Sequence, residues 1–528
     1  MADSGGTRRP TPTEVEKLVN WCDGDVDEVV RQLVDVGQSK AWARRAVAAV
    51  IAQAATDGTS ALAPVVELGD RRRAAPGSGE PLTELGYARR LIAEKGGELR
   101  YVVPWGRWLV WDGTRWAPDT DGHVARCAKV IARQVHTALI ASATADHEAI
   151  RAAKRAESSS GIKGALTLAA TEPEIAIVPE QLDAHPHLLN CLNGVVDLRM
   201  GNVGPHDPAL LLTKITGASY RPDASGEAFA AFLSRVQPDE EMRVFIRRLL
   251  GLSLEGQVTA HVLPIFHGDG ANGKSTLMDA VMHALGDYAD AGDPDLLRAR
   301  TFDAHPTGVA DLHGRRLVVI HESDAGHRLA EGTVKRLTGG DRLKARRMRE
   351  DFWSFEPSHT FVMLSNHKPA VRGADEGIWR RLRLVPFAEV IPAAERDESL
   401  GRTLAAEADA ILAWLVAGHL DWRSGGLREP EAVIAATAAY RAQSDPLGRF
   451  LAAQCLVMPA LHAGSTELFR AWEQWCTAER EDPGTHAAFA EAMKAKGFES
   501  RKSHGTMRWL GVGLAAGEDG ERGEGGEG

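Results

Sequence analysis

Residues 268–275 read Gly268-Asp-Gly-Ala-Asn-Gly-Lys274-Ser275, a complete G-x-x-x-x-G-K-[ST] pattern, and this stretch decides the fold. It directly follows the apolar run 262–266 and precedes a helical stretch at 276–285. A strand, a glycine-rich loop and a helix in this order form a unit that binds nucleotide phosphates. The sequence therefore predicts an α/β core with a parallel sheet and a nucleotide at the start of a helix.

Each position of this loop has a chemical task. Glycines let successive backbone N–H groups turn inward around phosphates, and the helix N-terminus adds partial positive charge. Lys274 is expected to reach the β and γ phosphates, and the Ser275 hydroxyl to hold Mg²⁺. A simple glycine-rich turn is the alternative, and the strand–loop–helix context argues against it. We predict ATP and Mg²⁺ as cofactors, with nucleotide contacts from Gly268, Asp269, Gly270, Ala271, Asn272, Gly273, Lys274, Ser275 and Thr276.

About forty residues further on, the run 316–324 has the pattern of a buried strand that ends in acids. An acid that emerges beside the phosphate loop is able to hold Mg²⁺ or to polarise the attacking water. Glu322 is the candidate for this role and a second candidate metal ligand. His321 occupies the place of the usual aspartate, so Ser275 and water are expected to carry much of the metal shell. An acid that merely ends a strand is the alternative.

Two further segments carry candidate residues for hydrolysis. The apolar run 361–365 ends at Asn366, whose amide is suited to orienting the attacking water against the γ-phosphate. Arg380 and Arg381 precede another apolar run, and an arginine supplied across a subunit boundary neutralises transition-state charge. Taken alone, such an asparagine is more often a turn former, and surface arginines are commonplace. Because they occur together with the phosphate loop, Asn366, Arg380 and Arg381 are all catalytic candidates.

Residues 335–349 carry seven lysines and arginines against one acid. A solvated face is the usual reading of such a run. Here a Gly-Gly break at 339–340 allows a loop or hairpin that projects cations toward a phosphate backbone, as sequence-independent DNA binding requires. The predicted DNA-binding residues are Lys335, Lys344, Arg346, Arg347 and Arg349.

Global composition gives weaker limits. A hydrophobic fraction of 44% and a charged fraction of 25% are typical of globular proteins, and the net charge of −10 requires any DNA contact to be locally basic. The five cysteines are scattered, which argues against structural zinc and against a disulfide framework. No signal peptide and no membrane-length apolar run is apparent, so we expect a cytoplasmic protein that does not contact a membrane.

The chain of 528 residues is expected to form several domains. Helical spacing marks the first segment, a Gly/Pro/Ser-rich stretch follows it, and helices with a final hairpin around residue 505 suggest a winged-helix fold near the end. The predicted boundaries are 1–55 for a helical unit, 56–84 for a flexible linker, 85–225 for a mixed α+β domain, 226–424 for the ATPase, 425–514 for the winged helix and 515–528 for a disordered acidic tail.

The order of motifs resembles the superfamily 3 helicases found as the C-terminal part of phage and plasmid primases, which are related to poxvirus replication ATPases. Its elements are the phosphate loop, the strand ending at Glu322, K-x-L-T-G-G-D at 335–341, S-N-x-x-P at 365–369 and W-R-R at 379–381. Segments 109–116, 192–201 and 205–208 are similar to that family's helicase-associated domain, and 445–451 to its C-terminal domain. The resemblance covers about residues 85–515.

This resemblance implies a hexameric ring of AAA+-like modules around DNA, with ATP at subunit interfaces. It implies nucleotide and Mg²⁺ binding by Lys274 and Ser275, an acidic motor residue at Glu322, a sensor at Asn366 and a trans-acting finger at Arg380 or Arg381. Single-stranded DNA would pass through the channel, and the winged helix would engage duplex or origin DNA. About 80 residues precede the match, too few for a polymerase domain, so primer synthesis is expected from a separate primase.

Two other classes of function remain open. A small-molecule kinase or metabolic enzyme with the same phosphate loop would have no use for the basic segment, and stimulation of ATP hydrolysis by single-stranded DNA separates the two. A replication initiator would bind DNA through the winged helix and use ATP only to control assembly. A strand-displacement assay separates that protein from a helicase.

Overall fold

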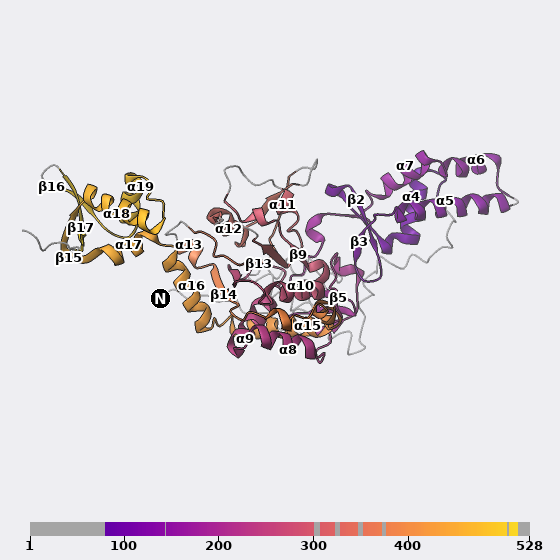
Figure 1. Cartoon of the computed structure of the whole chain (residues 1–528). Coiled ribbons are helices and arrows are strands. Elements are labelled where there is room, and N and C mark those ends of the chain that lie inside the picture. The colour runs from indigo at the N-terminus through magenta and orange to yellow at the C-terminus, as the bar shows by residue number, and fades with distance from the viewer. Residues whose placement is uncertain are drawn as a thin grey trace, which may run out of the picture.

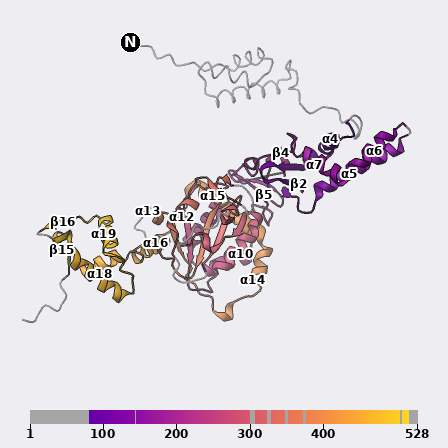
Figure 2. The ribbon, with the colours of Figure 1, turned by 90° about the horizontal axis from the view of Figure 1, so that it is seen from above.

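The computed structural model describes residues 80–142, 144–299, 307–322, 328–346, 352–371, 376–503 and 506–515. The predicted helical unit at 1–55, most of the predicted linker and nearly all of the acidic tail lie outside these residues. The described residues form three bodies that follow one another in chain order (Figures 1 and 2).

The first body combines helices with a small sheet of strand order β3-β2-β1-β4. Its core contains Trp116, which is fully buried, and a helical cluster around Leu91 and Ile131. The strand pairs β1–β2 and β2–β3 are antiparallel. The elements are α4 (Glu84–Lys95), β1 (Leu99–Val102), β2 (Arg107–Trp111), β3 (Trp116–Pro118), α5 (His123–Ala141), α6 (His147–Ala156), α7 (Ser159–Ala169) and β4 (Ala176–Ile177).

A second antiparallel sheet, β5-β6-β7, joins this body to the central one. Leu189 and Val196 from this sheet belong to the same buried cluster as residues of the central helices. The connection is therefore a packed interface and not a free linker. The strands are β5 (Leu188–Cys191), β6 (Gly194–Asp197) and β7 (Asn202–Gly204).

The central body contains a five-stranded sheet in the order β14-β8-β13-β10-β9, and all four strand pairs are parallel. Most residues of β8, β10 and β13 are buried, because a parallel sheet is covered on both faces. The mixed α/β fold with a parallel sheet is thereby confirmed. The strands are β8 (Leu263–His267), β9 (Ala289–Ala291), β10 (Leu317–His321), β13 (Thr360–Ser365) and β14 (Leu382–Pro386).

Alternate residues of these strands enter two separate cores. Phe266 and Leu364 pack into one cluster, whereas Ile265 and Met363 pack into the other. Helices on the first side are α8 (Glu227–Val236), α9 (Glu240–Leu252), α10 (Lys274–Leu285), α14 (Leu400–Ala406) and α15 (Ala408–Gly425). On the second side lie α11 (Thr307–Ala310), β11 (Leu343–Ala345), β12 (Trp353–Phe355), α12 (Glu331–Leu337), α13 (Glu376–Trp379) and part of α16 (Glu431–Gln443).

The strand order brings together the segments that carry the candidate catalytic residues. β13 lies between β8, which leads into the phosphate loop, and β10, which leads into Glu322. Since the three strands are parallel, their carboxyl ends share one edge of the sheet. Gly268, Glu322 and Asn366 therefore begin loops at the same edge.

The last body has its own core around Phe450, Trp472 and Trp509. Its three-stranded sheet has the order β15-β17-β16, and it contains the helices and the hairpin that the sequence predicts. Its elements are α17 (Pro446–Gln454), β15 (Cys455–Gly464), α18 (Ser465–Glu479), α19 (His486–Ala495), β16 (Ser500–Ser503) and β17 (Thr506–Leu514).

Helix α16 lies within the segment predicted to start the C-terminal domain, yet the structure packs it against the central sheet. Thr437 Oγ1 accepts a hydrogen bond of 3.0 Å from the Leu384 backbone in β14. Tyr440 belongs to the second core of the sheet, whereas the separate C-terminal core starts at Leu447. The compact C-terminal unit thus begins after α16.

In the part of the chain that the structure describes, no single helix is long and apolar enough to cross a membrane. The bent pair α14 and α15 together has the length and apolar composition of a membrane span. Many residues of α15 are buried in the core of the central body.

Candidate nucleotide and DNA sites

The phosphate-loop sequence leaves the sheet at the end of β8 and enters helix α10 at Lys274. Gly273 has a left-handed backbone with φ 78°, and a Cβ at this position would lie 2.5 Å from the side chain of Val236 in α8. A Cβ on Gly268 would collide with the backbone carbonyl of Phe387. Both glycines are therefore required, because the loop is pressed between α8 and the segment after β14.

The Lys274 ammonium lies at the centre of this loop. It donates hydrogen bonds to Gly268 O at 2.7 Å, to Asn272 Oδ1 at 2.9 Å and to Asn366 Oδ1 at 3.2 Å. The residue is only 5% exposed, and desolvation lowers the pKa of its ammonium group while Asp269 acts in the opposite sense. All three acceptors are neutral oxygens. A phosphate could therefore bind the Lys274 ammonium without breaking an ion pair to a carboxylate.

Asn272 fixes the loop against β14. Its side-chain nitrogen donates to Phe387 O at 3.1 Å while its oxygen accepts from Lys274. The other predicted nucleotide contacts lie along the same loop: Asp269 and Ser275 are exposed, and Ala271 has φ 49° and accepts a backbone hydrogen bond of 2.8 Å from Ile391. Thr276 follows Ser275 in the first turn of α10.

Glu322 follows β10 and is tied to the end of β13. Its backbone N–H donates to Leu364 O at 2.9 Å, and its carboxylate accepts a hydrogen bond from Ser365 Oγ. The Ser365 hydroxyl is also within hydrogen-bonding reach of the carbonyl of His367. Ser365 thus connects the acid to the segment that carries Asn366. His321 lies at the end of β10 with its side chain exposed, and Asp324, the second acid at the end of the run 316–324, lies outside the described residues.

Arg380 and Arg381 lie at the opposite edge of the sheet. Arg381 O accepts a 2.7 Å hydrogen bond from the N–H of Leu263, the first residue of β8. A strand of five residues rises about 16 Å, which separates this edge from the phosphate loop of the same subunit. Neither arginine is therefore placed to reach a nucleotide bound by its own chain.

The two arginines differ sharply in environment. Arg381 is 6% exposed and donates to Thr338 Oγ1 at 3.1 Å and to Gly377 O at 2.7 Å. The side chain of Arg380 is exposed and has no hydrogen-bond or ion-pair partner within the described residues. Arg381 therefore stabilises the fold, whereas the side chain of Arg380 points to the surface of the chain.

Part of the basic segment, Leu343–Ala345, forms strand β11, which pairs antiparallel with β12 in a hairpin. Leu343 and Phe355 anchor the hairpin in the second core, while Lys344 points outward. The cations of Lys344 and Arg346 lie 4.9 Å and 4.8 Å from the ring centroid of Phe352, which is 51% exposed. Two cations and an exposed aromatic ring therefore share one surface. Lys335 lies apart on α12, and Arg347 and Arg349 lie outside the described residues.

Sequence reasoning missed several residues of these sites. Ser365 and Thr338 lie within the quoted motifs S-N-x-x-P and K-x-L-T-G-G-D, but neither was assigned a role. Phe352 follows the basic segment directly, and an aromatic residue beside a run of cations was an available signal. No pattern in the sequence indicates that Thr338 is the partner of Arg381.

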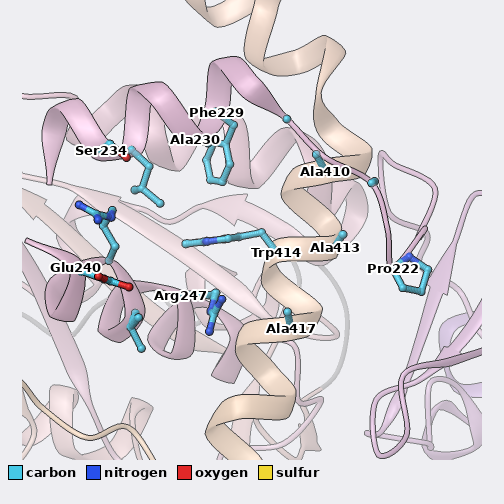
Figure 3. Close-up of a pocket in the computed structure, with 15 residues that line it drawn as sticks. Pro222, Phe229, Ala230, Ser234, Glu240, Arg247, Ala410, Ala413, Trp414 and Ala417 are labelled. Carbon is cyan, nitrogen blue, oxygen red and sulfur yellow. The ribbon is translucent and has the colours of Figure 1, made fainter. Parts of the chain in front are cut away.

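A pocket of about 450 Å³ lies between α8, α9 and α15. Phe229 and Trp414 pack edge to face across it, with ring centroids 5.2 Å apart, and Arg247 lines it from α9 (Figure 3). None of its lining residues belongs to the predicted nucleotide site. Two residues of α8, Phe229 and Leu233, line the pocket. Two others of the same helix, Phe232 and Val236, lie beside Gly273.

In the described parts of the chain, no three His, Cys, Asp or Glu side chains form a group able to hold a metal ion. A magnesium ion bound with a nucleotide needs only one or two protein ligands, because phosphates and water supply the others. The hydroxyl of Ser275 and the carboxylate of Glu322 are the hard oxygen donors that such an ion prefers. The residues present therefore fit a nucleotide-bound Mg²⁺.

Family models match two parts of the chain. Residues 88–238 match a family described as "D5 N terminal like", and residues 266–381 match a family of unknown function, DUF5906. The first match covers the N-terminal body and α8. The second contains the phosphate loop, Glu322, the hairpin, Asn366 and both arginines.

Curated viral proteins align with the chain at low identity. A "Putative helicase" of Acanthamoeba polyphaga mimivirus is 30% identical over 294 residues, which is 51% of this chain and 30% of that protein. A "Putative helicase" of Frog virus 3 is 25% identical over 47% of this chain and 28% of its own. A "Putative primase" of African swine fever virus is 26% identical over 39% of this chain and 22% of its own. The chain thus spans less than a third of these relatives.

Among solved structures, the apo structure of the NrS-1 C terminal region aligns with a TM-score of 0.48 and 13% identity, over 82% of this chain and 100% of that one. A second form of the same region aligns with a TM-score of 0.47 and 12% identity. Over these two regions the chain is thus similar to phage and viral proteins described as helicases or primases.

Proposed function

We propose that this chain is the motor of a replicative DNA helicase that hydrolyses ATP at subunit interfaces and moves along DNA. The observation that carries the proposal is the convergence of Lys274, Asn366 and Glu322 at the carboxyl edge of one parallel sheet. A basic loop residue, an amide and an acid in this order meet the needs of phosphoryl transfer to water.

The proposed chemistry assigns one task to each residue. Lys274 and the backbone N–H groups of the loop hold the phosphates, and Asn366 orients the attacking water. Ser275 and Glu322 hold Mg²⁺, which neutralises charge on the phosphates when it is bound. Because Ser365 hydrogen-bonds to Glu322, the acid and the water-orienting segment are expected to move together.

The sheet order supports an AAA+-like motor. One strand separates the strand of the phosphate loop from the strand of the acid, so that a polar residue at its end faces both. In the C-terminal body, the order of helices α18 and α19 followed by the hairpin β16–β17 supports a winged-helix domain. We propose that this domain contacts duplex or origin DNA through Arg501, Lys502 and Arg508 of the hairpin.

A ring is proposed because the exposed Arg380 lies far from the phosphate loop of its own chain. Arg380 lies one strand length from the phosphate loop of its own chain, exposed and without a side-chain partner in the described residues. A neighbouring subunit that presents Arg380 to the γ-phosphate would complete the site, as trans-acting arginines do in related chemistry. The proposed assembly is a homo-oligomeric ring, hexameric by family resemblance.

Lys344, Arg346 and Phe352 support contact with single-stranded DNA. Cations bind the phosphate backbone without regard to sequence, and an exposed ring stacks on any base. Both features occur on one hairpin that is anchored in the core of the sheet. We propose that this hairpin faces the channel of the ring and transmits motion of the motor to the strand. Primer synthesis is left to another domain or chain.

Strand displacement from a forked DNA duplex with ATP and Mg²⁺ tests this proposal. The parent chain should release the displaced strand, and Lys274→Ala, as a matched control, should not. ATP-dependent assembly on DNA without displacement would favour the replication initiator. Hydrolysis that DNA does not stimulate would favour the metabolic enzyme.

A further inference from the structure

Tyr440 of α16 contacts both segments that are proposed to act on ATP. Its hydroxyl donates a hydrogen bond to the backbone carbonyl of Pro369, which lies three positions after Asn366. Its ring packs against Trp379, the residue directly before Arg380, with ring centroids 5.2 Å apart and planes at 76°. The side chain is 2% exposed, so it is fixed in this place by its surroundings.

Neighbouring contacts strengthen each half of this arrangement. Lys368 Nζ donates to Gln443 Oε1 at 2.8 Å, which ties the segment after Asn366 to the end of α16. Arg441 pairs with Glu376 at the start of α13, with one nitrogen–oxygen distance of 3.2 Å, which ties the segment before Arg380 to the same helix. Three residues within one turn of α16 therefore hold two segments that belong to different edges of the sheet.

Packing alone does not explain the hydroxyl group. Phenylalanine would fill the same apolar volume among Trp379 and Leu382, whereas a buried phenol needs a hydrogen-bond partner. The carbonyl of Pro369 is that partner. Burial raises the pKa of Tyr440, and the nearby Glu322 charge adds to this effect, so the hydroxyl remains a neutral donor.

We propose that Tyr440 is a positioning residue that couples the water-orienting segment of one ATP site to the arginine presented to the next site. This inference rests on the proposed function. A γ-phosphate at the loop competes with Asn366 for the three N–H donors of Lys274. A resulting shift of Asn366 and Pro369 would pass through Tyr440 to Trp379 and Arg380, so that occupation of one site adjusts hydrolysis at its neighbour.

The first test is Tyr440→Phe, which keeps the ring and removes the donor. We expect kcat for ATP to fall roughly fivefold, the size expected for loss of one hydrogen bond. Nucleotide affinity should stay within about twofold, and the Hill coefficient for ATP should move toward 1. Tyr87→Phe is the matched control, because the Tyr87 hydroxyl is buried without a hydrogen-bond partner in the described structure. It should leave all three quantities at the parent values.

A mixed-ring experiment isolates the trans effect. Parent subunits are mixed with excess Lys274→Ala subunits, which lack hydrolysis but still present Arg380 to parent sites. The same mixture is then prepared with the double variant Lys274→Ala/Tyr440→Phe as the excess subunit. The double variant should support roughly fivefold less hydrolysis per parent site, since only the position of the presented arginine differs.

Three results separate the outcomes. If the melting temperature of Tyr440→Phe equals that of the parent, its lower activity is not a folding defect. If Tyr440→Phe does not fold, Lys368→Met replaces it in both assays, because this substitution breaks an exposed contact to the same helix. Equal kcat, Hill coefficient and mixed-ring activity with and without the substitution would overturn this inference. A parent chain that does not hydrolyse ATP would overturn the proposed function instead.

Discussion

The ammonium group of Lys274 donates a 3.2 Å hydrogen bond to the side-chain oxygen of Asn366, which lies 92 positions further along the chain. The contact joins the start of α10 to the loop after β13, across neighbouring parallel strands. It is the structural reason to treat the phosphate loop and Asn366 as parts of one site.

Substitution of Asn366 by alanine should lower kcat for ATP at least tenfold and leave nucleotide affinity within about threefold. The reason is that a water-orienting amide acts mainly in the transition state, whereas the loop binds the phosphates in the ground state. Steady-state hydrolysis and binding of a fluorescent nucleotide measure the two quantities. Asn202→Ala, in an exposed position of β7, is the matched control. A fall in affinity that accounts for the whole loss of activity would contradict the assignment.

Arg380→Ala and Arg381→Ala should have different effects. Arg381 is buried and bonded to Thr338 and Gly377, so its loss should lower the free energy of unfolding by about 2 kcal/mol. Arg380 is exposed, so its loss should leave stability within about 0.5 kcal/mol and abolish hydrolysis while ATP still binds.

Complementation then tests action in trans. Mixed rings of Arg380→Ala and Lys274→Ala chains should recover part of the activity, because some interfaces combine an intact loop with an intact arginine. Absence of recovery in rings whose mixing has been verified would show that the arginine acts within its own chain.

The hairpin residues should determine affinity for single-stranded DNA. Lys344→Ala and Arg346→Ala should each reduce affinity and lower the slope of log affinity against log salt by about 0.7, the value for one phosphate contact on a single strand. Phe352→Ala should cost about 1–3 kcal/mol of binding with an unchanged salt slope, since stacking is not electrostatic. Lys129→Ala on α5, also exposed, is the control. Unchanged DNA binding with a collapse of basal hydrolysis would place the cations at the nucleotide interface.

Acid should destabilise the fold through His359. This side chain is 2% exposed, pairs with Leu337 O at 3.2 Å and has its pKa lowered to about 4 by burial. The unfolded chain, with a histidine pKa of about 6.5, binds more protons between these values, so stability is full above pH 6.5 and falls as the pH drops toward 4. The loss should approach about 3 kcal/mol at a slope of about 1.4 kcal/mol per pH unit.

His359→Gln is the test of this pH dependence. Glutamine does not titrate and keeps a donor for Leu337 O. The difference in unfolding free energy between parent and variant, measured by denaturant titration from pH 7.5 to 4, should shrink as the pH falls. A difference that is constant with pH would show that His359 is not responsible.

The sequence predicts the central sheet well, because its strands are continuous apolar runs and each ends in a residue with chemical character. Val319 and Ile320 illustrate this, because they point into the two opposite cores of the sheet. A strand that is buried on both faces is apolar at every position, so it stands out in the sequence as a continuous apolar run. The phosphate loop is predictable for a further reason, since its glycines are required by local backbone geometry and close packing.

Other features depend on contacts between distant segments, which no local pattern records. Arg380 and Arg381 are adjacent in sequence, and only the packing of Thr338 against the second of them separates a structural residue from an exposed one. The assignment of α16 to the C-terminal domain fails similarly, because Thr437 and Tyr440 are ordinary helical residues until β14 and Pro369 are placed beside them.

The most direct test of the account is the rate of ATP hydrolysis with and without single-stranded DNA, measured for the parent and for Lys274→Ala. The parent should hydrolyse ATP and should be stimulated several-fold by DNA. Lys274→Ala should fall to background with the circular dichroism spectrum of the parent, because the lysine serves the phosphates and its loss leaves the core intact. Turnover by Lys274→Ala at the parent rate, or a parent that hydrolyses no ATP with DNA present, would contradict the account.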